Sequence, residues 1–302
     1  MKPLDLQVNG YAGVDFCADV LTADDLRRAC QKLIADEVES ILVTLITDSI
    51  DSLVSKLTNL VRLRESDPIV QQVVAGFHIE GPFLNPNPGF IGAHPSHSVV
   101  PANVDDAKRL LDAAGGMARL VTLAPEFDVG FATTAYLVDQ GVTVSAGHCD
   151  PPLDQLRGAI DAGLSMVTHF GNGCPVELAR HDNFLQRVLH VRDSLWVCFI
   201  PDGAHVPFFV MQNYLDLIGT ERTIMVTDAI SAATLGPGQY EISGMAVEVD
   251  EAGVARKPGS KNLAGSTITM PGIIHNLKCE LGFNDGAIER MIDINPRAAI
   301  GF

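Results

Sequence analysis

The stretch VTVSAGHCDPPLDQLRGAIDAGLSMVTHF, residues 142–170, decides the fold. Each of its ends is a short apolar run with β-branched residues, and each run leads into a histidine, His148 or His169. The segment between the runs, residues 152–162, has the apolar spacing of an amphipathic helix. A strand, a helix and a second strand of these lengths form the unit from which parallel sheets are built.

The same unit recurs along the chain. Apolar strands are expected at residues 4–9, 41–47, 73–80, 118–126, 142–148, 164–170, 195–205 and 223–231. Helix-length segments separate them, the first at residues 22–37 with Thr22 as the N-cap and Asp25 in a capping box. Strands buried on both faces and alternating with helices predict an α/β fold, the closed (β/α)8 TIM barrel. We expect one domain over residues 1–302, with a β-hairpin at about 238–258 that turns at Glu251–Gly253.

Composition narrows the class of protein. The chain has 302 residues, of which 47% are hydrophobic and 19% charged, and its net charge of −16 disfavours nucleic acid and anionic membrane surfaces as partners. The N-terminal segment MKPLDLQVNG has no apolar signal-peptide core, and no apolar run is long enough to span a membrane. The six cysteines include no CxxC pair, which favours reduced thiols in a cytoplasmic protein.

Polar side chains follow the predicted strands, where the active sites of TIM barrels lie. These residues are Gln7, Asn9, Glu80, His148, His169, Asp202, His205 and Asp228. His148 and His169 are one strand–helix unit apart and therefore project from neighbouring strands. Two imidazoles and a carboxylate such as Glu80 are the ligands of a catalytic Zn²⁺ or Fe²⁺ with an open position for water. The alternative is a pair of histidines hydrogen-bonded in a polar core.

Asp228 follows the last expected strand and has two interpretations. It could take a proton from metal-bound water and pass it to a leaving group. Alternatively, it could be a hydrogen-bond partner of a ligating histidine. We favour the role in proton transfer.

A set of motifs, in this order, resembles the N-acetylglucosamine-6-phosphate deacetylases of the amidohydrolase superfamily. They are QVNGYAGVDF, GFHIEGPFLNP followed by GAH, TLAPE, SAGHCD, THFGNG, PDGAHVP, VTDAISAA and NLAGSTITMPG. The resemblance implies Glu80, His148 and His169 as metal ligands and Asp228 as the general acid/base. It also implies His94 on the acetamide, with Asn172, Gly173 and His205 on the sugar or phosphate. Arg180 is the nearest match to an arginine that binds phosphate in the family, sometimes across a dimer interface.

The first strand resembles that of the mononuclear members of the superfamily, and the chain departs from the family's pattern elsewhere. Many amidohydrolases carry HxH in the first strand for a second metal, whereas Gln7 and Asn9 stand here, and amides are poorer ligands than imidazole. We therefore expect one divalent metal, Zn²⁺ before Fe²⁺. The stretch THFGNGC replaces the family's THLFNAM, and residues 175–186 lack a PG-containing loop beside Arg180. Most of the family's small β-sandwich domain is expected to be missing, because residues 1–302 run from the first barrel strand to NPRAAIGF.

The expected function is removal of the N-acetyl group from N-acetylglucosamine 6-phosphate by a metal-dependent hydrolase, expected to be a homodimer. One alternative is an amidohydrolase acting on another N-acyl compound. Its substrate would be N-acetylgalactosamine 6-phosphate, an unphosphorylated amino sugar or an N-acyl amino acid. An alternative of another class is a non-catalytic barrel that binds a sugar.

Overall fold

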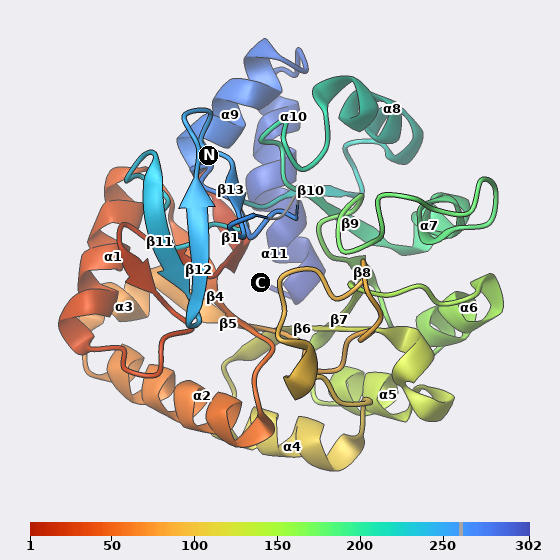
Figure 1. Ribbon diagram of the computed structural model, residues 1–302, viewed down its shortest axis with the longest axis horizontal. Coiled ribbons are helices and arrows are strands. Elements are labelled where there is room, and N and C mark those ends of the chain that lie inside the picture. Colours follow the sequence, from red (N-terminus) through yellow and green to blue (C-terminus); the bar gives the residue numbers. More distant parts are fainter. Residues whose placement is uncertain (260–261) are drawn as a thin grey trace.

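A parallel sheet forms the centre of the computed structural model, which describes residues 1–259 and 262–302. Within these residues, eight parallel strands are hydrogen-bonded in the order of the chain, and a bridge between Val8 and Ala229 joins the two edges. The strands are β1 (Leu4–Val8), β4 (Ser40–Ile46), β5 (Val74–Glu80), β6 (Ala118–Leu123), β7 (Thr143–Ala146), β8 (Met166–Val167), β9 (Trp196–Phe199) and β10 (Thr223–Met225). The predicted TIM barrel is confirmed (Figure 1).

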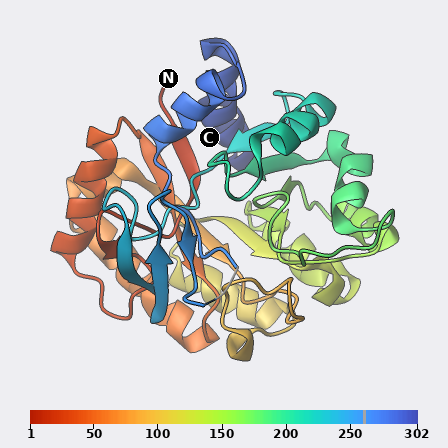
Figure 2. The ribbon, with the colours of Figure 1, turned by 45° about the horizontal axis from the view of Figure 1, so that its top comes forward.

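Helices surround the sheet, as Figure 2 shows. They are α1 (Ala23–Ala35), α2 (Ile50–Glu65), α3 (Pro68–Val73), α4 (Val104–Ala113), α5 (Ala132–Asp139), α6 (Leu153–Asp161), α7 (Phe184–Val191), α8 (Phe208–Ile218), α9 (Met270–Cys279), α10 (Asp285–Glu289) and α11 (Asn295–Ile300). Short 3₁₀ turns are η1 (Ser96–Ser98), η2 (Pro125–Phe127), η3 (Val129–Phe131) and η4 (Arg192–Ser194). In the described part of the chain, none of the helices is both long and apolar enough to cross a membrane.

Local sequence explains where the first helix begins. The Thr22 hydroxyl accepts a hydrogen bond from the Asp25 backbone N–H at 3.2 Å, and the Asp25 carboxylate accepts one from the Thr22 N–H at 3.3 Å. The predicted capping box is therefore present. The buried face of α1 consists of Leu26, Ala29, Cys30 and Leu33, which belong to the core that surrounds the sheet.

The interior of the barrel changes from apolar to polar along its axis. Leu4, Leu6 and apolar residues in or next to other barrel strands form a cluster with Ile300 of α11. The register of β1 against β4 shifts between Asp5 and Val8. Such a shift re-aims side chains, and beyond it the amides of Gln7 and Asn9 bond to carboxylates at the other end of the barrel.

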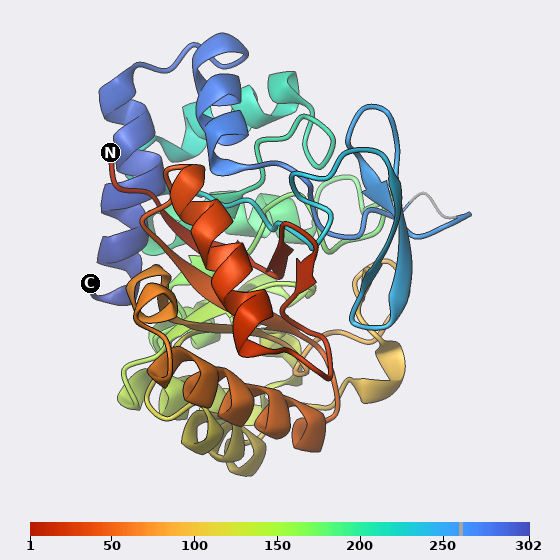
Figure 3. The same ribbon diagram turned by 90° about the vertical axis from the view of Figure 1, so that its left-hand side faces the viewer.

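A small antiparallel sheet lies at that end, which we call the mouth. Its strands are β11 (Gly238–Ile242), β12 (Met245–Val249) and β13 (Ala255–Arg256). The expected turn at Glu251–Gly253 is present, because these residues join the antiparallel strands β12 and β13. The sheet has a second turn that was not predicted, in which Ser243 and Gly244, both at positive φ, join β11 to β12. Figure 3 shows the sheet at one end of the barrel and both chain termini at the opposite end. A two-residue ribbon pairs β2 (Gly10–Tyr11) with β3 (Val14–Asp15).

The C-terminal helical segment is less regular than its sequence predicts. A π-helical turn, η5 (Arg290–Ile294), separates α10 from α11. Pro296 stands in the first turn of α11. Proline has no N–H to donate and crowds the carbonyl of the preceding turn, which favours a local change of helical pitch.

Candidate active site

A cavity of about 410 Å³ opens at the mouth of the barrel, a volume typical of small-molecule sites. Ile242 and Met245 of the small sheet contribute to one side. Nine of the residues expected at the site line the cavity: Asn9, Glu80, His94, His148, His169, Asn172, Gly173, His205 and Asp228. The ends of the strands therefore bring together residues that lie far apart in the sequence.

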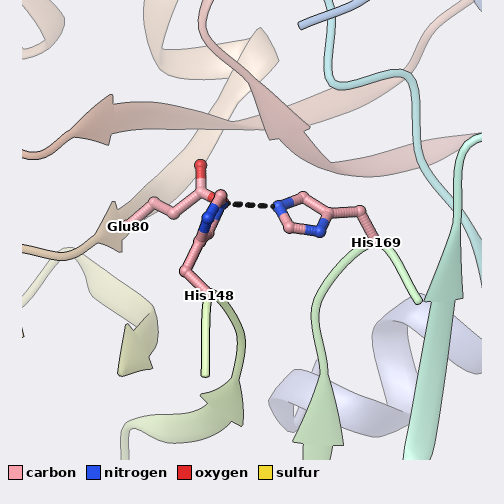
Figure 4. Close-up of side chains that lie close together, drawn as sticks. All are labelled: Glu80, His148 and His169. Carbon is pink, nitrogen blue, oxygen red and sulfur yellow. Dashed lines mark hydrogen bonds and ion pairs between the residues drawn. The ribbon is translucent and has the colours of Figure 1, made fainter. Parts of the chain in front are cut away.

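Glu80, His148 and His169 converge on one point at the mouth (Figure 4). His169 Nε2 lies 2.9 Å from Glu80 Oε1 and 3.1 Å from His148 Nε2, and His148 Nε2 lies 3.5 Å from the same carboxylate oxygen. Ligand atoms about 2.0–2.2 Å from one ion are separated by about 3 to 3.5 Å at tetrahedral or octahedral angles. The donor set and its spacing therefore fit a divalent metal, and these three residues can hold one.

Contacts around His148 fix its ring. Its Nδ1 lies 2.7 Å from the carbonyl oxygen of Phe90, which can only accept, so the Nδ1 carries the proton. Nε2 is then the ring atom directed toward Glu80 and His169. A Cβ at Gly173 would lie 3.0 Å from His148 Nδ1, so a glycine is needed for this close approach.

The backbone is strained at three of the strand ends. His148, His169 and Asp228 have φ values of 50°, 31° and 50°, in or near the left-handed region that non-glycine residues seldom adopt. The chain turns sharply at each of these residues, just beyond its strand, and the side chain reaches the cavity. Strain of this kind clusters at functional sites, where surrounding contacts hold it in place.

Glu80 is held by the first strand as well as by the histidines. The expectation that Gln7 lines the cavity was wrong, because this residue lies outside the lining and donates from Nε2 to Glu80 Oε2 at 3.1 Å. The other carboxylate oxygen, Glu80 Oε1, faces His148 and His169. Burial works against the charged form, but the hydrogen bonds to His148 and His169 hold the pKa of Glu80 well below its ordinary value.

Asp228 lies in the same buried site with the opposite shift. Burial and the negative charge of Glu80 raise its pKa to about 7, and the hydrogen bond from Asn9 partly opposes them. Asn9 Nδ2 donates to Asp228 Oδ1 at 2.6 Å. A carboxyl group with a pKa near neutrality can both accept and return a proton.

His94 can donate a hydrogen bond into the cavity. Its Nδ1 accepts from the backbone N–H of Thr47 at 3.3 Å, so the proton of the neutral ring is on Nε2. Burial, together with the charge on His148, lowers the pKa of His94 to about 3 and keeps the ring neutral at physiological pH.

His205 lies beside a carboxylate, which favours its charged form. Its Nδ1 lies 2.6 Å from Asp202 Oδ2. Burial opposes the charged ring, but this hydrogen bond and the charges of Asp202 and Asp228 raise the pKa of His205. Among the described residues that line the cavity, only histidines can carry positive charge.

Arg180 lies outside this cavity. Its side chain is exposed, it is not part of the cavity lining, and it forms no ion pair with any residue that the structure describes. Within one chain, the structure therefore does not bring Arg180 together with the other residues expected at the site.

Sequence reasoning missed the residues beneath the site. His78 is fully buried two residues before Glu80, and its Nε2 lies 2.8 Å from Thr122 Oγ1. A chain of hydroxyl groups continues from Thr122 to Thr168 and Ser145. Burial lowers the pKa of His78 to about 4, so its ring is a neutral part of this network. The period of two along a strand was the available signal, because it places His78 and Glu80 on the same face.

A TIM barrel with a glutamate and two histidines converging beside an aspartate is the arrangement of the amidohydrolase superfamily. No family model matches the chain. It is 33% identical over 205 residues to the N-acetylglucosamine-6-phosphate deacetylase of Lysinibacillus sphaericus, with 68% of this chain and 52% of that protein covered. It is 28% identical to the N-acetylgalactosamine-6-phosphate deacetylase of Escherichia coli O157:H7, with 99% and 77% covered.

A solved structure is also similar. It is a mutant of the N-acetyl-D-glucosamine-6-phosphate deacetylase of Mycobacterium smegmatis, in complex with N-acetyl-D-glucosamine-6-phosphate. The TM-score is 0.90 at 30% identity, with 100% of this chain and 77% of that chain covered. The chain belongs to the N-acetylglucosamine-6-phosphate deacetylase family. It spans about half the length of the Lysinibacillus relative.

Proposed function

We propose that the protein is a metal-dependent deacetylase that hydrolyses N-acetylglucosamine 6-phosphate to glucosamine 6-phosphate and acetate. The convergence of Glu80, His148 and His169 beside Asp228 is the observation that carries the proposal. Family membership supports the choice of substrate. The proposed metal is a single Zn²⁺, because the set contains two imidazoles and one carboxylate and the first strand offers amides.

Asp228 and His94 have separate roles in the proposed reaction. When bound, the metal would polarise the acetamide carbonyl and lower the pKa of water. Asp228 takes a proton from the attacking water and returns it to the nitrogen as the C–N bond breaks. The His94 Nε2–H donates to the carbonyl oxygen as negative charge develops on it. The products are acetate and the free amine.

The 6-phosphate group needs positive charge near the cavity. We propose that His205, Asn172 and the backbone of Gly173 contact the sugar or its phosphate. Arg180 would reach the cavity of a neighbouring subunit in a homodimer. Its exposure and its lack of an ion pair with described residues support this arrangement. The free cysteines, Cys17, Cys30, Cys149, Cys174, Cys198 and Cys279, support the expectation of a reducing, cytoplasmic location.

A second candidate substrate is N-acetylgalactosamine 6-phosphate, because the E. coli relative with that name aligns with 99% of the chain. The test is acetate release by the Zn²⁺-loaded protein from four sugars: N-acetylglucosamine and N-acetylgalactosamine, each with and without the 6-phosphate. We expect the highest kcat/KM on N-acetylglucosamine 6-phosphate. A higher kcat/KM on N-acetylgalactosamine 6-phosphate would make that sugar the preferred substrate. Failure to release acetate from any of the four sugars would contradict deacetylation.

A further inference from the structure

Asn9 is the buried side chain whose position the proposed reaction does not yet explain. It is 2% exposed at the end of β1. Its Nδ2 donates to Asp228 Oδ1 at 2.6 Å, and its Oδ1 has no hydrogen-bond partner among the described residues. A buried, unpaired carbonyl oxygen costs stability. Among the described residues, Asp228 is the only side-chain hydrogen-bond partner found for Asn9, so the contact to Asp228 is what the amide supplies.

The closure of the barrel holds the amide against the carboxylate. The Asn9 N–H donates to the carbonyl oxygen of Ala229 at 2.7 Å, and the Asn9 carbonyl accepts from the Phe16 N–H at 3.0 Å. Ala229 directly follows Asp228. The next residue, Gly10, also donates to Ala229, and a Cβ there would lie 2.7 Å from the backbone nitrogen of Ser231. The backbones that carry the two side chains are thus fixed relative to each other.

The contact makes the two oxygens of Asp228 different. Oδ1 is occupied by the Asn9 amide, whereas Oδ2 has no hydrogen bond among the described residues and is not a fully buried unpaired atom. Asp228 lines the cavity with 8% of its surface exposed. Proton transfer needs one carboxylate oxygen free to approach water and then the leaving nitrogen.

We propose that Asn9 is a positioning residue, which holds Asp228 by Oδ1 and leaves Oδ2 as the oxygen that exchanges protons with water and substrate. This inference rests on the proposed function. The first strand would thereby serve the reaction through hydrogen bonds to the site's carboxylates.

Asn9→Leu tests the role, because leucine has the same number and branching of side-chain heavy atoms and cannot donate. We expect kcat for N-acetylglucosamine 6-phosphate to fall about 10- to 100-fold, with KM and bound metal unchanged. The melting temperature should fall somewhat, because the buried Asp228 Oδ1 loses its donor. Asn9→Ala provides a second variant if leucine does not fold. Asn213→Ala, an exposed asparagine on α8, should behave as the wild type.

A double-mutant cycle separates positioning from a general structural effect. In an Asp228→Asn background, Asn9→Leu should lower the residual kcat by less than twofold, because the residue acts through Asp228. A further tenfold loss in that background, or a Leu variant with wild-type kcat, would overturn the inference and leave the proposed function standing. A wild-type protein that releases no acetate would overturn both.

Discussion

Glu80 and Asp228 are two carboxylates in one buried site, and their surroundings push their pKa values apart. Hydrogen bonds to His148 and His169 lower the pKa of Glu80, whereas burial and the charge of Glu80 raise that of Asp228 to about 7. Opposite shifts of neighbouring groups indicate different roles. Glu80 remains an anion suited to bind a metal, and Asp228 can gain and lose a proton. The amide of Gln7 reinforces the first role by holding Glu80 Oε2.

Replacing Asp228 by asparagine tests its role in proton transfer. We expect Asp228→Asn to keep its metal, because the residue is not one of the three converging ligands. An amide cannot shuttle a proton, so kcat should fall about 10²- to 10⁴-fold. Elemental analysis and acetate release from the same sample provide the two measurements. Near-wild-type kcat with metal bound would show that Asp228 only orients a neighbour.

Asp5 provides a pH test of stability away from the cavity. It accepts hydrogen bonds from Thr227 and Gln7, yet burial raises its pKa from 3.8 to about 6. The folded protein therefore binds more protons than the unfolded chain between these values, and stability falls as the pH rises through this window. Asp5→Asn removes this pH-dependent loss of stability, because asparagine does not titrate. Its free energy of unfolding relative to the wild type should increase by about 1 kcal/mol between pH 5 and pH 7.5.

Urea unfolding at both pH values measures this difference. Asp216→Asn, an exposed aspartate on α8, serves as the control and should show a difference near zero. A relative stability of Asp5→Asn that does not change with pH would mean that Asp5 has the same pKa in the folded and unfolded states.

At the scale of elements, the ends of the strands carry the site, and sequence reasoning located them well. His148 and His169 follow equivalent positions of consecutive strand–helix units, so their meeting could be predicted from spacing. The strands themselves are shorter than expected: β8 pairs only at Met166–Val167 and β10 ends at Met225. Beyond these ends the backbone turns through positive φ at His169 and Asp228, and hydropathy gives no indication of such a turn.

Depth within the barrel was harder to predict. Gln7 and Asn9 both end the first strand, but Gln7 lies beneath Glu80 while Asn9 reaches the cavity. Apolar and polar alternation distinguishes the two faces of a strand and not the layer at which a side chain stands. His78 was missed for the same reason, since it lies inside a strand, one layer below the strand end.

The turn of the small sheet allows a test of that element. Ser243 has φ of 50° and Gly244 of 76°, as in the two-residue hairpin turn that suits small or flexible residues. A β-branched residue is strained there by about 1–3 kcal/mol. We expect Ser243→Val to loosen β11 and β12, displace Ile242 and Met245 from the cavity, and raise KM about 3- to 10-fold. Bound metal should not change.

Ser243→Gly is the matched control for this turn, because glycine adopts positive φ without strain. Its KM should equal that of the wild type. If Ser243→Val also left KM unaltered in steady-state assays of acetate release, the small sheet would have no part in binding the substrate.

For the whole molecule, the proposed function requires that a chain with a net charge of −16 bind a phosphorylated sugar. Distant carboxylates are screened within about 10 Å at ordinary salt, whereas a charge-assisted contact acts at hydrogen-bond distance. Local positive charge would therefore decide binding. In the proposed function, His205 would supply part of this charge and Arg180 the rest from a second subunit.

Two variants with different defects can test whether Arg180 acts across subunits. Arg180→Ala should raise KM for the 6-phosphorylated sugar about tenfold or more and leave activity on the unphosphorylated sugar nearly unchanged. Asp228→Asn should be almost inactive on both sugars.

When the two variants are unfolded together and refolded as a mixture, a heterodimer contains one site with both residues intact. That site keeps its own Asp228 and receives Arg180 from the other subunit, so low-KM activity should return in proportion to the heterodimer fraction measured by light scattering and native mass spectrometry. A mixture no more active than the sum of its components would show that Arg180 does not act in trans, and equal loss on both sugars would assign the arginine a structural role.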